Sequence, residues 1–454
     1  MFITATRIAL SLLLCTPFVS AQLSGTVGPT TTHAAKRTII CNVLNYGGVV
    51  GSPDIGPAIL SAFTNCVKVN SGSTLYVPPG NYDMATWVTL DDGSHWAFQL
   101  DATTGGHMII IENALDFEFY SSTSAGTIQG LGYQCRNAGE PLAAPEFHIV
   151  VQGGANGEMY NLAIRGADIG GSDGIDISGT NHWVHDVEVT NRDECVTVKS
   201  PASDFLIENI YCNQSGGSAI GSLGAGTAIE NIVYKNVYTN GGNQIMMIKS
   251  NGGDGYVKNV LFQNFLATGS AYGLDIDQYW SSETTVAGNG VTLTNIEFET
   301  WNGLVVDGVK RPPYRIICAD AAPCSGITLT DVWLWSETGE AVIDCESAFG
   351  TGVGCLRSGS TSSYAAATTS YTKPASYTTL KTMTGDLTAG FASTASIPAP
   401  YVAFLEPGTL LTALISEQSQ PLSILGWPRF RLWLKIGTAP PTRCVKLNLI
   451  GHPA

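Results

Sequence analysis

Three acidic residues, Asp173, Asp193 and Glu194, stand at matching positions before two short apolar runs. Asp173 and Glu194 each precede the last apolar residue of a run, Ile177 or Val198, by four residues. If these runs are neighbouring parallel strands, about 4.8 Å apart, the carboxyl groups lie too close for all of them to ionise, so at least one pKa must rise. A protonated carboxyl beside an ionised one suits glycosidic bond hydrolysis, which needs an acid for the leaving oxygen and a base or nucleophile.

A lysine joins the same alignment. Two further strand-like runs end at Ile220 and Ile248, and Lys249 directly follows the second. Taken singly, each acidic residue is typical of a solvent-facing turn. Three carboxylates at one strand end, aligned with a lysine, favour a catalytic cluster instead. Asp176 alternates with apolar neighbours inside its strand, and we interpret it as structural or supporting.

The elements that must position these residues follow from an internal repeat. An apolar residue, any residue, Asn or Asp, and another apolar residue recur with spacings of 25, 23, 22, 28, 36 and 36 residues. The short polar side chains suit bends in left-handed geometry and can bond to neighbouring backbone. The seven Asn and Asp positions are Asn161, Asp186, Asn209, Asn231, Asn259, Asn295 and Asp331.

Short strands repeated at this length, with Gly, Asn and Ser between them, predict a β-solenoid in which no coil buries its apolar face alone. We therefore expect an all-β fold, a single-stranded right-handed parallel β-helix. An antiparallel sandwich and a propeller are the alternatives, but neither predicts one sequential motif at variable coil length.

The ends of the chain differ from its centre. Arg7, an apolar run over residues 8–15 and small residues up to Ala21 are typical of a cleaved secretory signal, and the run is too short to span a bilayer. We expect a secreted, extracellular protein without membrane contact. Its predicted parts are a signal peptide (1–21), a catalytic β-helix (22–356), a Ser/Thr/Ala-rich tail, disordered or O-glycosylated (357–415), and a basic apolar tail of unknown role (416–454).

The chain has 11 Cys, of which one lies in the predicted signal. The other ten are an even number, which in a secreted chain favours disulfides over metal binding. Cys135 and Cys444 lack an obvious local partner. Spacing suggests four local pairs, Cys41 with Cys66, Cys195 with Cys212, Cys318 with Cys324, and Cys345 with Cys355.

The net charge of −15, from 22 basic and 37 acidic residues, disfavours nucleic acid as a partner, because little would neutralise phosphates. It also disfavours a polyanionic substrate at neutral pH, an objection that an acidic medium weakens. We expect a monomer with no metal and no cofactor.

Segments 171–176, 191–195 and 248–249 resemble, in order, the three signatures of glycoside hydrolase family 28, the family of polygalacturonases and rhamnogalacturonan hydrolases. The resemblance spans residues 38 to 356. Polygalacturonases carry a His and an Arg where this chain has Gly216 and Met247, so two groups that would hold galacturonate are absent. The surrounding residues, such as 192–201 and 247–253, resemble the fungal rhamnogalacturonan hydrolase branch.

The resemblance implies cleavage of the α-1,2 link between galacturonic acid and rhamnose in pectic rhamnogalacturonan, with inversion. It assigns Asp193 as general acid and leaves Asp173 and Glu194 to position and deprotonate the water. It implies that Lys249 binds a substrate carboxylate, a charge-assisted contact. Asp277 and Tyr279, one coil onward, are weaker candidates on the leaving-group side.

Several alternatives stay open. A polygalacturonase or xylogalacturonan hydrolase is the main competitor, a Ca²⁺-dependent pectate lyase using Arg192 is a second, and a non-catalytic carbohydrate-binding solenoid is a third. Residues 213–215 form an N-glycosylation sequon at Asn213. Between about residues 101 and 160 the chain is shorter than the family pattern, as if one or two coils were missing before the catalytic ones.

Overall fold

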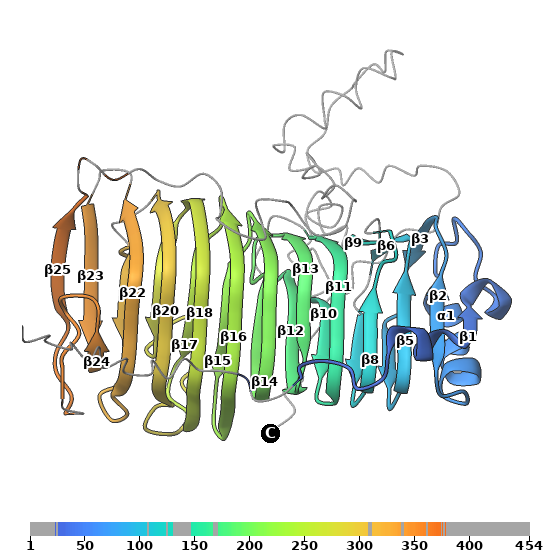
Figure 1. The fold of residues 1–454 in the computed structure, drawn as a ribbon, viewed down its shortest axis with the longest axis horizontal. Coiled ribbons are helices and arrows are strands. Elements are labelled where there is room, and N and C mark those ends of the chain that lie inside the picture. Colours follow the sequence, from blue (N-terminus) through green and yellow to red (C-terminus); the bar gives the residue numbers. More distant parts are fainter. Residues whose placement is uncertain are drawn as a thin grey trace, which may run out of the picture.

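The computed structural model describes residues 26–106, 109–123, 126–129, 147–166, 171–306, 311–336, 340–359 and 362–373, together with Leu23, Ala375 and Tyr377. Four short helical elements cap the N-terminal end: η1 (His33–Arg37), η2 (Val43–Tyr46), α1 (Gly56–Ala62) and η3 (Phe63–Val67). Strands make up almost all of the remaining regular structure and lie side by side along the long axis (Figure 1).

The strands of the N-terminal half are β1 (Ile39–Asn42), β2 (Ser73–Val77), β3 (Asn81–Met84), β4 (Val88–Asp91), β5 (Ser94–Leu100), β6 (Thr103–Gly106), β7 (Ile109–Glu112), β8 (Leu115–Tyr120), β9 (Thr127–Gln129), β10 (Phe147–Gln152), β11 (Ala155–Arg165), β12 (Asp173–Thr180) and β13 (Trp183–Thr190). Those of the C-terminal half are β14 (Val196–Asn213), β15 (Ser218–Leu223), β16 (Thr227–Asn240), β17 (Gln244–Ser250), β18 (Gly255–Ser270), β19 (Tyr272–Asp277), β20 (Thr292–Val305), β21 (Tyr314–Ile317), β22 (Cys324–Ser336), β23 (Glu340–Glu346), β24 (Ala348–Thr351) and β25 (Ala367–Thr372).

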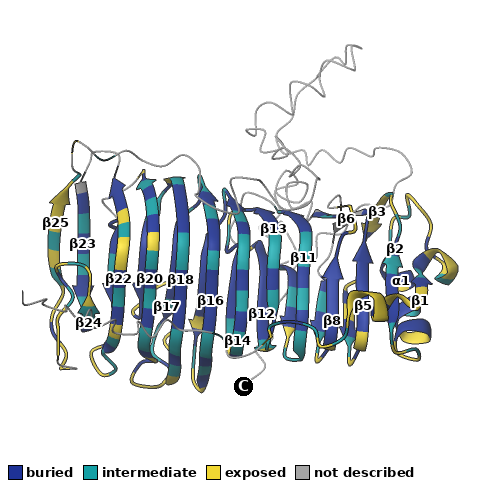
Figure 2. Ribbon diagram, viewed as in Figure 1, coloured by how far each residue is buried: buried dark blue, intermediate teal, exposed yellow. Residues whose placement is uncertain are grey.

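Parallel pairing between successive coils confirms the right-handed parallel β-helix. One sheet runs through β10, β12, the first part of β14, β15, β17, β19, β21 and β23. Its buried column contains Ile177, Val198, Ile220, Ile248 and Ile276 in register, so the alignment expected from sequence is confirmed. Such stacking supplies each coil with a neighbour for its apolar face. Figure 2 shows this buried interior, with exposure concentrated at turns and at the two ends.

The Asn and Asp positions of the repeat adopt the expected left-handed geometry, with φ between 51° and 56°. The structure nevertheless corrects the repeat itself, because each coil has two such bends five residues apart. Asn209 stacks below Asn236, whereas Asn231 stacks below Asn259 in a second column. The predicted motif therefore mixed two bends of one coil, so it gave a step of 22 residues from Asn209 to Asn231, whereas the stacked bends Asn209 and Asn236 are 27 residues apart. Most of the remaining unevenness comes from coils of different length.

Side chains in these two columns form hydrogen-bonded ladders. The amide of Asn236 donates to Oδ1 of Asn209 at 3.1 Å, and that of Asn264 donates to Oδ1 of Asn236 at 2.6 Å. Aromatic rings stack in the same way inside the helix, as Tyr234, Phe262 and Phe298 do at centroid distances of 5.1 and 5.3 Å. Both arrangements repeat side chains at the rung spacing and so fix the register between coils.

The described coils before the site stack on one another. β8 pairs directly with β11, and β7 with β10, so the parallel pairing continues between residues 101 and 160. At the other end β25 pairs antiparallel with β23. The folded unit therefore extends beyond residue 356 and includes residues 367–372 of the predicted tail. The predicted signal and the tail after residue 415 lie outside the described residues.

All four disulfide pairings expected from spacing are confirmed: Cys41–Cys66, Cys195–Cys212, Cys318–Cys324 and Cys345–Cys355. Cys135 and Cys444 lie outside the described residues. Among the described residues, no helix is long and apolar enough to cross a membrane.

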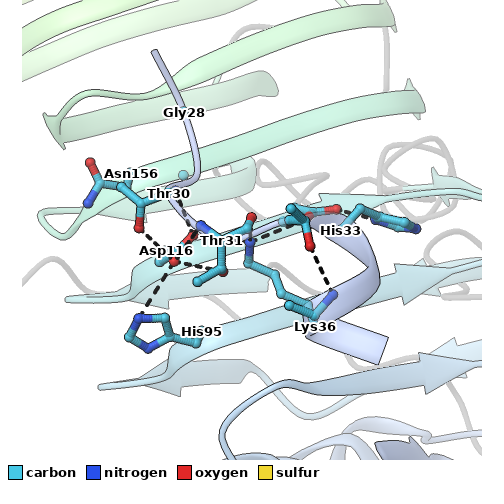
Figure 3. A network of polar contacts seen from close by, with 12 residues as sticks. Gly28, Thr30, Thr31, His33, Lys36, His95, Asp116 and Asn156 are labelled. Atoms are coloured by element: carbon cyan, nitrogen blue, oxygen red, sulfur yellow. Dashed lines mark hydrogen bonds and ion pairs between the residues drawn. The ribbon is translucent and has the colours of Figure 1, made fainter. Parts of the chain in front are cut away.

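The segment before η1 crosses the coils and is held by buried charges (Figure 3). The Lys36 side chain is fully buried, with Nζ 3.0 Å from Asp116 Oδ1 and 3.3 Å from Glu118 Oε1. Asp116 also accepts hydrogen bonds from the backbone and hydroxyls of Thr30 and Thr31. Removing Lys36 or either carboxylate would leave a buried charge without its partner, which is strongly destabilising. This network therefore holds the segment against β8.

Candidate active site

The three predicted carboxylates meet at one edge of the sheet. Asp173 begins β12, and Asp193 and Glu194 lie in the turn between β13 and β14. One oxygen from each residue lies within 4.8 Å of the others. The Gly174 amide donates to the Glu194 carbonyl at 2.9 Å, which sets the two turns one rung apart.

Neighbouring side chains hold these turns in place, and the sequence analysis did not identify them. Asn191, fully buried, donates from Nδ2 to the carbonyls of Ser172 (2.6 Å) and Glu194 (3.0 Å). Nδ1 of His148, one rung before, donates to the Asp173 carbonyl at 2.8 Å. Burial lowers the pKa of His148 and so favours its neutral form. The bonds to Ser172 and Asp173 cross between coils, so no local sequence signal marks these contacts.

Burial and mutual repulsion separate the carboxyl groups into protonated and ionised ones. Burial, and then the charge of Glu194, raise the pKa of Asp173 well above its ordinary value. Burial and a hydrogen bond to Glu194 raise the pKa of Asp193 to about 7. Burial would raise the pKa of Glu194 too, but the bond from Asp193 and the charge of Lys249 outweigh it and lower that pKa. The cluster therefore holds an ionised Glu194 between protonated neighbours.

Lys249 lies where the alignment placed it, and its Nζ donates a hydrogen bond to Oε1 of Glu194. Asp277 stands beside it on the next rung, in register. Tyr279 is exposed, and its hydroxyl accepts a hydrogen bond from the Asp320 amide at 2.9 Å. The structure thus brings Lys249 to the carboxylates, whereas Asp277 and Tyr279 lie farther along the same face.

The same face carries basic residues that the sequence analysis passed over. Nζ of Lys199 lies 3.3 Å from Oδ2 of Asp176, which is buried as expected of a supporting residue. Arg315 on β21 contacts Asp275 at 3.5 Å and Asp277 at 2.6 Å. Only the register of the coils shows that these residues share one surface.

The Asn213 side chain is buried inside a ladder, which argues against the sequon. Its Nδ2 donates to Oγ1 of Thr190 at 3.3 Å, and its Oδ1 accepts from Asn240 at 3.1 Å. A glycan on this nitrogen would have to displace the neighbouring coil.

Asp173, Asp193 and Glu194 could in principle hold a hard cation, since three carboxylate oxygens converge. Two of these groups are protonated at mildly acidic pH, and Lys249 already contacts the third. The donor set therefore fits a divalent cation poorly. An acid, an ionised base and a nearby cation suit acid–base hydrolysis instead.

A β-helix with such a cluster on its open face is the architecture of a polysaccharide-processing enzyme, and the comparisons specify the family. Residues 140–355 match the glycosyl hydrolases family 28. The chain is 48% identical over 447 residues to the probable rhamnogalacturonase B of Aspergillus fumigatus, covering 90% of this chain and 84% of that protein. It is 49% identical over 414 residues to rhamnogalacturonase A of Aspergillus aculeatus, covering 85% and 93%. The chain belongs to glycoside hydrolase family 28 and is a glycosidase.

A solved structure agrees on the fold. The endo-xylogalacturonan hydrolase of Aspergillus tubingensis superposes with a TM-score of 0.50 at 18% identity, covering 72% of this chain and 100% of that one. At this identity the likeness concerns the β-helix alone.

Proposed function

We propose that this protein hydrolyses the α-1,2 link between galacturonic acid and rhamnose in the rhamnogalacturonan backbone of pectin. The observation that carries the proposal is the carboxylate cluster with Lys249, in a chain about half identical to rhamnogalacturonases over most of its length. It acts as a secreted, extracellular monomer without metal or cofactor, and the four disulfides support an oxidising compartment.

Asp193 serves as the general acid. With its pKa near 7 it stays protonated in mildly acidic medium, and its proton can pass to the leaving glycosidic oxygen. Glu194, kept ionised by Lys249, takes a proton from the attacking water. Asp173 orients that water by hydrogen bonding, and Lys249 also binds a substrate carboxylate.

Only the family resemblance supports inversion of the anomeric centre. The nearest carboxyl oxygens lie within 4.8 Å, whereas inverting enzymes usually separate acid and base by about 6.5–9.5 Å. Proton NMR of the first-formed product distinguishes the outcomes. An initially β-configured reducing end indicates inversion, and an α-configured one indicates retention.

The backbone around Gly216 supports rhamnogalacturonan over polygalacturonate. A Cβ added there would lie 2.7 Å from the Asp193 carbonyl carbon and 2.8 Å from the Glu194 nitrogen. A His, the polygalacturonase residue at this position, does not fit without shifting the catalytic turn. Met247 likewise replaces the arginine of that enzyme class.

The test compares purified protein on de-esterified rhamnogalacturonan and on polygalacturonate at mildly acidic pH, with and without chelator, beside Asp193→Asn. We expect saturated oligomers from rhamnogalacturonan only, chelator-insensitive and lost in the variant. Products from polygalacturonate or xylogalacturonan would assign another family 28 activity, and unsaturated, chelator-sensitive products would assign a lyase. Binding without turnover, unchanged in Asp193→Asn, would indicate a carbohydrate-binding solenoid.

A further inference from the structure

The guanidinium of Arg311 is held over the open face of the sheet by two successive strands. Its Nη1 donates to Oε1 of Gln244, the first residue of β17, at 3.1 Å. The same nitrogen lies 3.4 Å from Oδ2 of Asp275 in β19. Arg311 itself belongs to the segment before β21, but these contacts place its head group at the level of β17 and β19.

Two aromatic rings pack against this head group. The guanidinium carbon lies 4.3 Å from the ring centroid of Tyr272 and 4.3 Å from that of Trp280. Tyr272 pairs in register with Gln244, and the Trp280 amide donates to the Ser250 carbonyl at 2.9 Å. Arginine stacks well on aromatic rings because its cation is planar and weakly hydrated. The rings therefore fix the guanidinium plane and leave its edge for hydrogen bonds.

The contacts of Arg311 leave donors for a ligand. Within the described residues, its hydrogen bonds and its ion pair are all made by Nη1. A guanidinium carries five N–H groups in a planar fork, so those on Nη2 and Nε remain. The side chain of Arg311 is 24% exposed, whereas that of Asp275 is 1% exposed. Arg311 is thus anchored through one nitrogen and can still offer two parallel N–H bonds to a carboxylate.

The head group lies in the row of turns that carries the catalytic carboxylates. The Asn243 side chain donates to the Arg192 carbonyl at 2.9 Å, and the Asn243 amide donates to the Ser215 carbonyl at 2.7 Å. These bonds join the turn before β17 to the catalytic turn. The level of β17 is two rungs from that of Glu194 and the level of β19 is three, because β14, β15, β17 and β19 pair in succession. At about 4.8 Å a rung, Arg311 stands roughly 10–14 Å from Glu194 along the helix axis.

Lys249 does not fill this position, although it belongs to β17. Its ammonium reaches back to Glu194 and serves the catalytic turn. The β17 residue in register with Asp275 is Met247, which is apolar and 1% exposed. Arg311 therefore presents a cation over a part of the face where β17 itself contributes an uncharged side chain.

Two acids and a second arginine surround this cation. Arg315 lies 2.6 Å from Oδ2 of Asp277 and 3.5 Å from Oδ1 of Asp275. Burial raises the pKa of Asp275 to about 6, although Arg315 and Arg311 oppose it. In mildly acidic medium Asp275 is therefore largely neutral, and Asp277, paired with Arg315, is the remaining counter-charge of the two arginines. The surplus of positive charge favours an incoming anion.

We propose that Arg311 binds the carboxylate of a galacturonate unit beyond the reacting bond and so selects acidic sugar chains. The inference rests on the proposed function, in which the substrate carries galacturonate at every second sugar. A cation roughly 10–14 Å from Glu194 meets a sugar other than the one that reacts. Arg311 thus contributes to binding and specificity, and not to the bond-breaking step.

The test measures binding by calorimetry in the Asp193→Asn protein, which should hold substrate without turnover. The ligands are rhamnogalacturonan oligosaccharides that extend well past the catalytic carboxylates on both sides, and the same oligosaccharides with their carboxyl groups reduced to alcohols. We expect Arg311→Met to weaken binding of the acidic ligand about tenfold, and of the reduced ligand less than twofold.

Lys258→Met is the matched control and should change neither affinity. Lys258, on β18, also lies over an aromatic ring, 4.5 Å from the centroid of Tyr256, and also pairs with an acid, Glu230, at 2.7 Å. Equal losses on both ligands in Arg311→Met would overturn the assignment, because an arginine that only ties its own segment to β17 and β19 does not distinguish a carboxylate from an alcohol. A loss under twofold on the acidic ligand would overturn it too.

A second variant covers the case in which Arg311→Met folds poorly. Arg311→Lys keeps the charge without the planar fork, so it should weaken binding of the acidic ligand about threefold and leave the reduced ligand unchanged. An equal change on both ligands in the folded Arg311→Lys protein would count against the carboxylate contact.

Kinetics with Asp193 intact separate binding from chemistry. Arg311→Met should raise KM for rhamnogalacturonan about tenfold and change kcat less than twofold, as expected when a contact made equally in the ground and transition states is lost. A fall in kcat at unchanged KM would contradict the binding role. None of these results touches the proposed function, which fails only if the wild-type protein does not hydrolyse rhamnogalacturonan.

Discussion

The ammonium of Lys249 contacts Oε1 of Glu194 across two rungs, from β17 to the turn before β14. The hydrogen bond from Asp193 and this ion pair together oppose the burial that would otherwise protonate Glu194, and so they keep this carboxyl group available as the base. Burial moves the pKa of Asp193 in the other direction. The Asp193–Glu194 hydrogen bond and the charge of Lys249 thus separate acid and base among three neighbouring carboxyl groups.

Lys249→Met should therefore change the pH profile as well as the rate. The pKa of Glu194 rises when its counter-charge is removed, so the acid limb of the kcat profile moves to higher pH. We expect kcat/KM to fall about 100-fold or more, because a substrate contact is lost too. The measurement is a pH–rate series on rhamnogalacturonan with Lys258→Met as control; an acid limb at the wild-type position would contradict the role given to Lys249.

Folding stability should fall as pH rises from about 4 toward 7. The folded pKa of Asp193 is raised from 3.8 to about 7, and that of Asp173 is raised as well. Over this window the folded protein binds more protons than the unfolded chain, so the free energy of unfolding decreases with pH. The stabilisation is fully present below pH 4 and is lost as pH passes through the folded pKa.

Calorimetric Tm values of wild type and Asp193→Asn across this window provide the check. The variant cannot ionise at residue 193, so its Tm should depend less steeply on pH. Asp331→Asn, at an exposed bend on another face, serves as the matched control and should follow the wild type. Parallel curves for Asp193→Asn and wild type would show that the pKa of Asp193 is not raised.

Lys36→Met should destabilise the protein by about 3–5 kcal/mol, since it leaves Asp116 and Glu118 buried without their cation. The network lies away from the catalytic carboxylates, and residues far apart usually act independently. At a low temperature, where the variant is still folded, kcat should therefore stay within about twofold of the wild-type value. Urea unfolding measures the first effect and a product assay the second. Arg37→Met removes an exposed neighbour and should cost under 1 kcal/mol by the same assay, in line with surface changes of about 0.5 kcal/mol.

Asn213 should carry no glycan in the secreted protein, because its amide is buried and hydrogen-bonded within a ladder. Mass spectrometry of the peptide that contains it, before and after enzymatic deglycosylation, gives the answer. Ser215→Ala removes the sequon without changing Asn213, and it should alter the mass of this peptide only by the difference between Ser and Ala. A fully glycosylated Asn213 peptide would contradict this prediction and would mean that the glycan is attached before the coil folds and buries this side chain.

The sequence alone predicted much of the fold because a solenoid is built from local repeats. Alternating apolar residues and left-handed Asn bends mark each coil, and the disulfides join cysteines at most 25 residues apart. Aligning Ile177 with Val198 was enough to bring Asp173 beside Glu194, since stacked coils repeat their register.

The tertiary structure decided what depends on contacts between coils. It showed two bends in each coil, where one motif had been read, and it placed β25 on β23. It also brought Arg315 to Asp277, from 38 residues away in the sequence, and buried Asn213. Coil length varies with the loops, so the sequence does not fix which side chains meet across rungs. Burial and charge at those meetings set the pKa values, and hence the division of the carboxyl groups into acid and base.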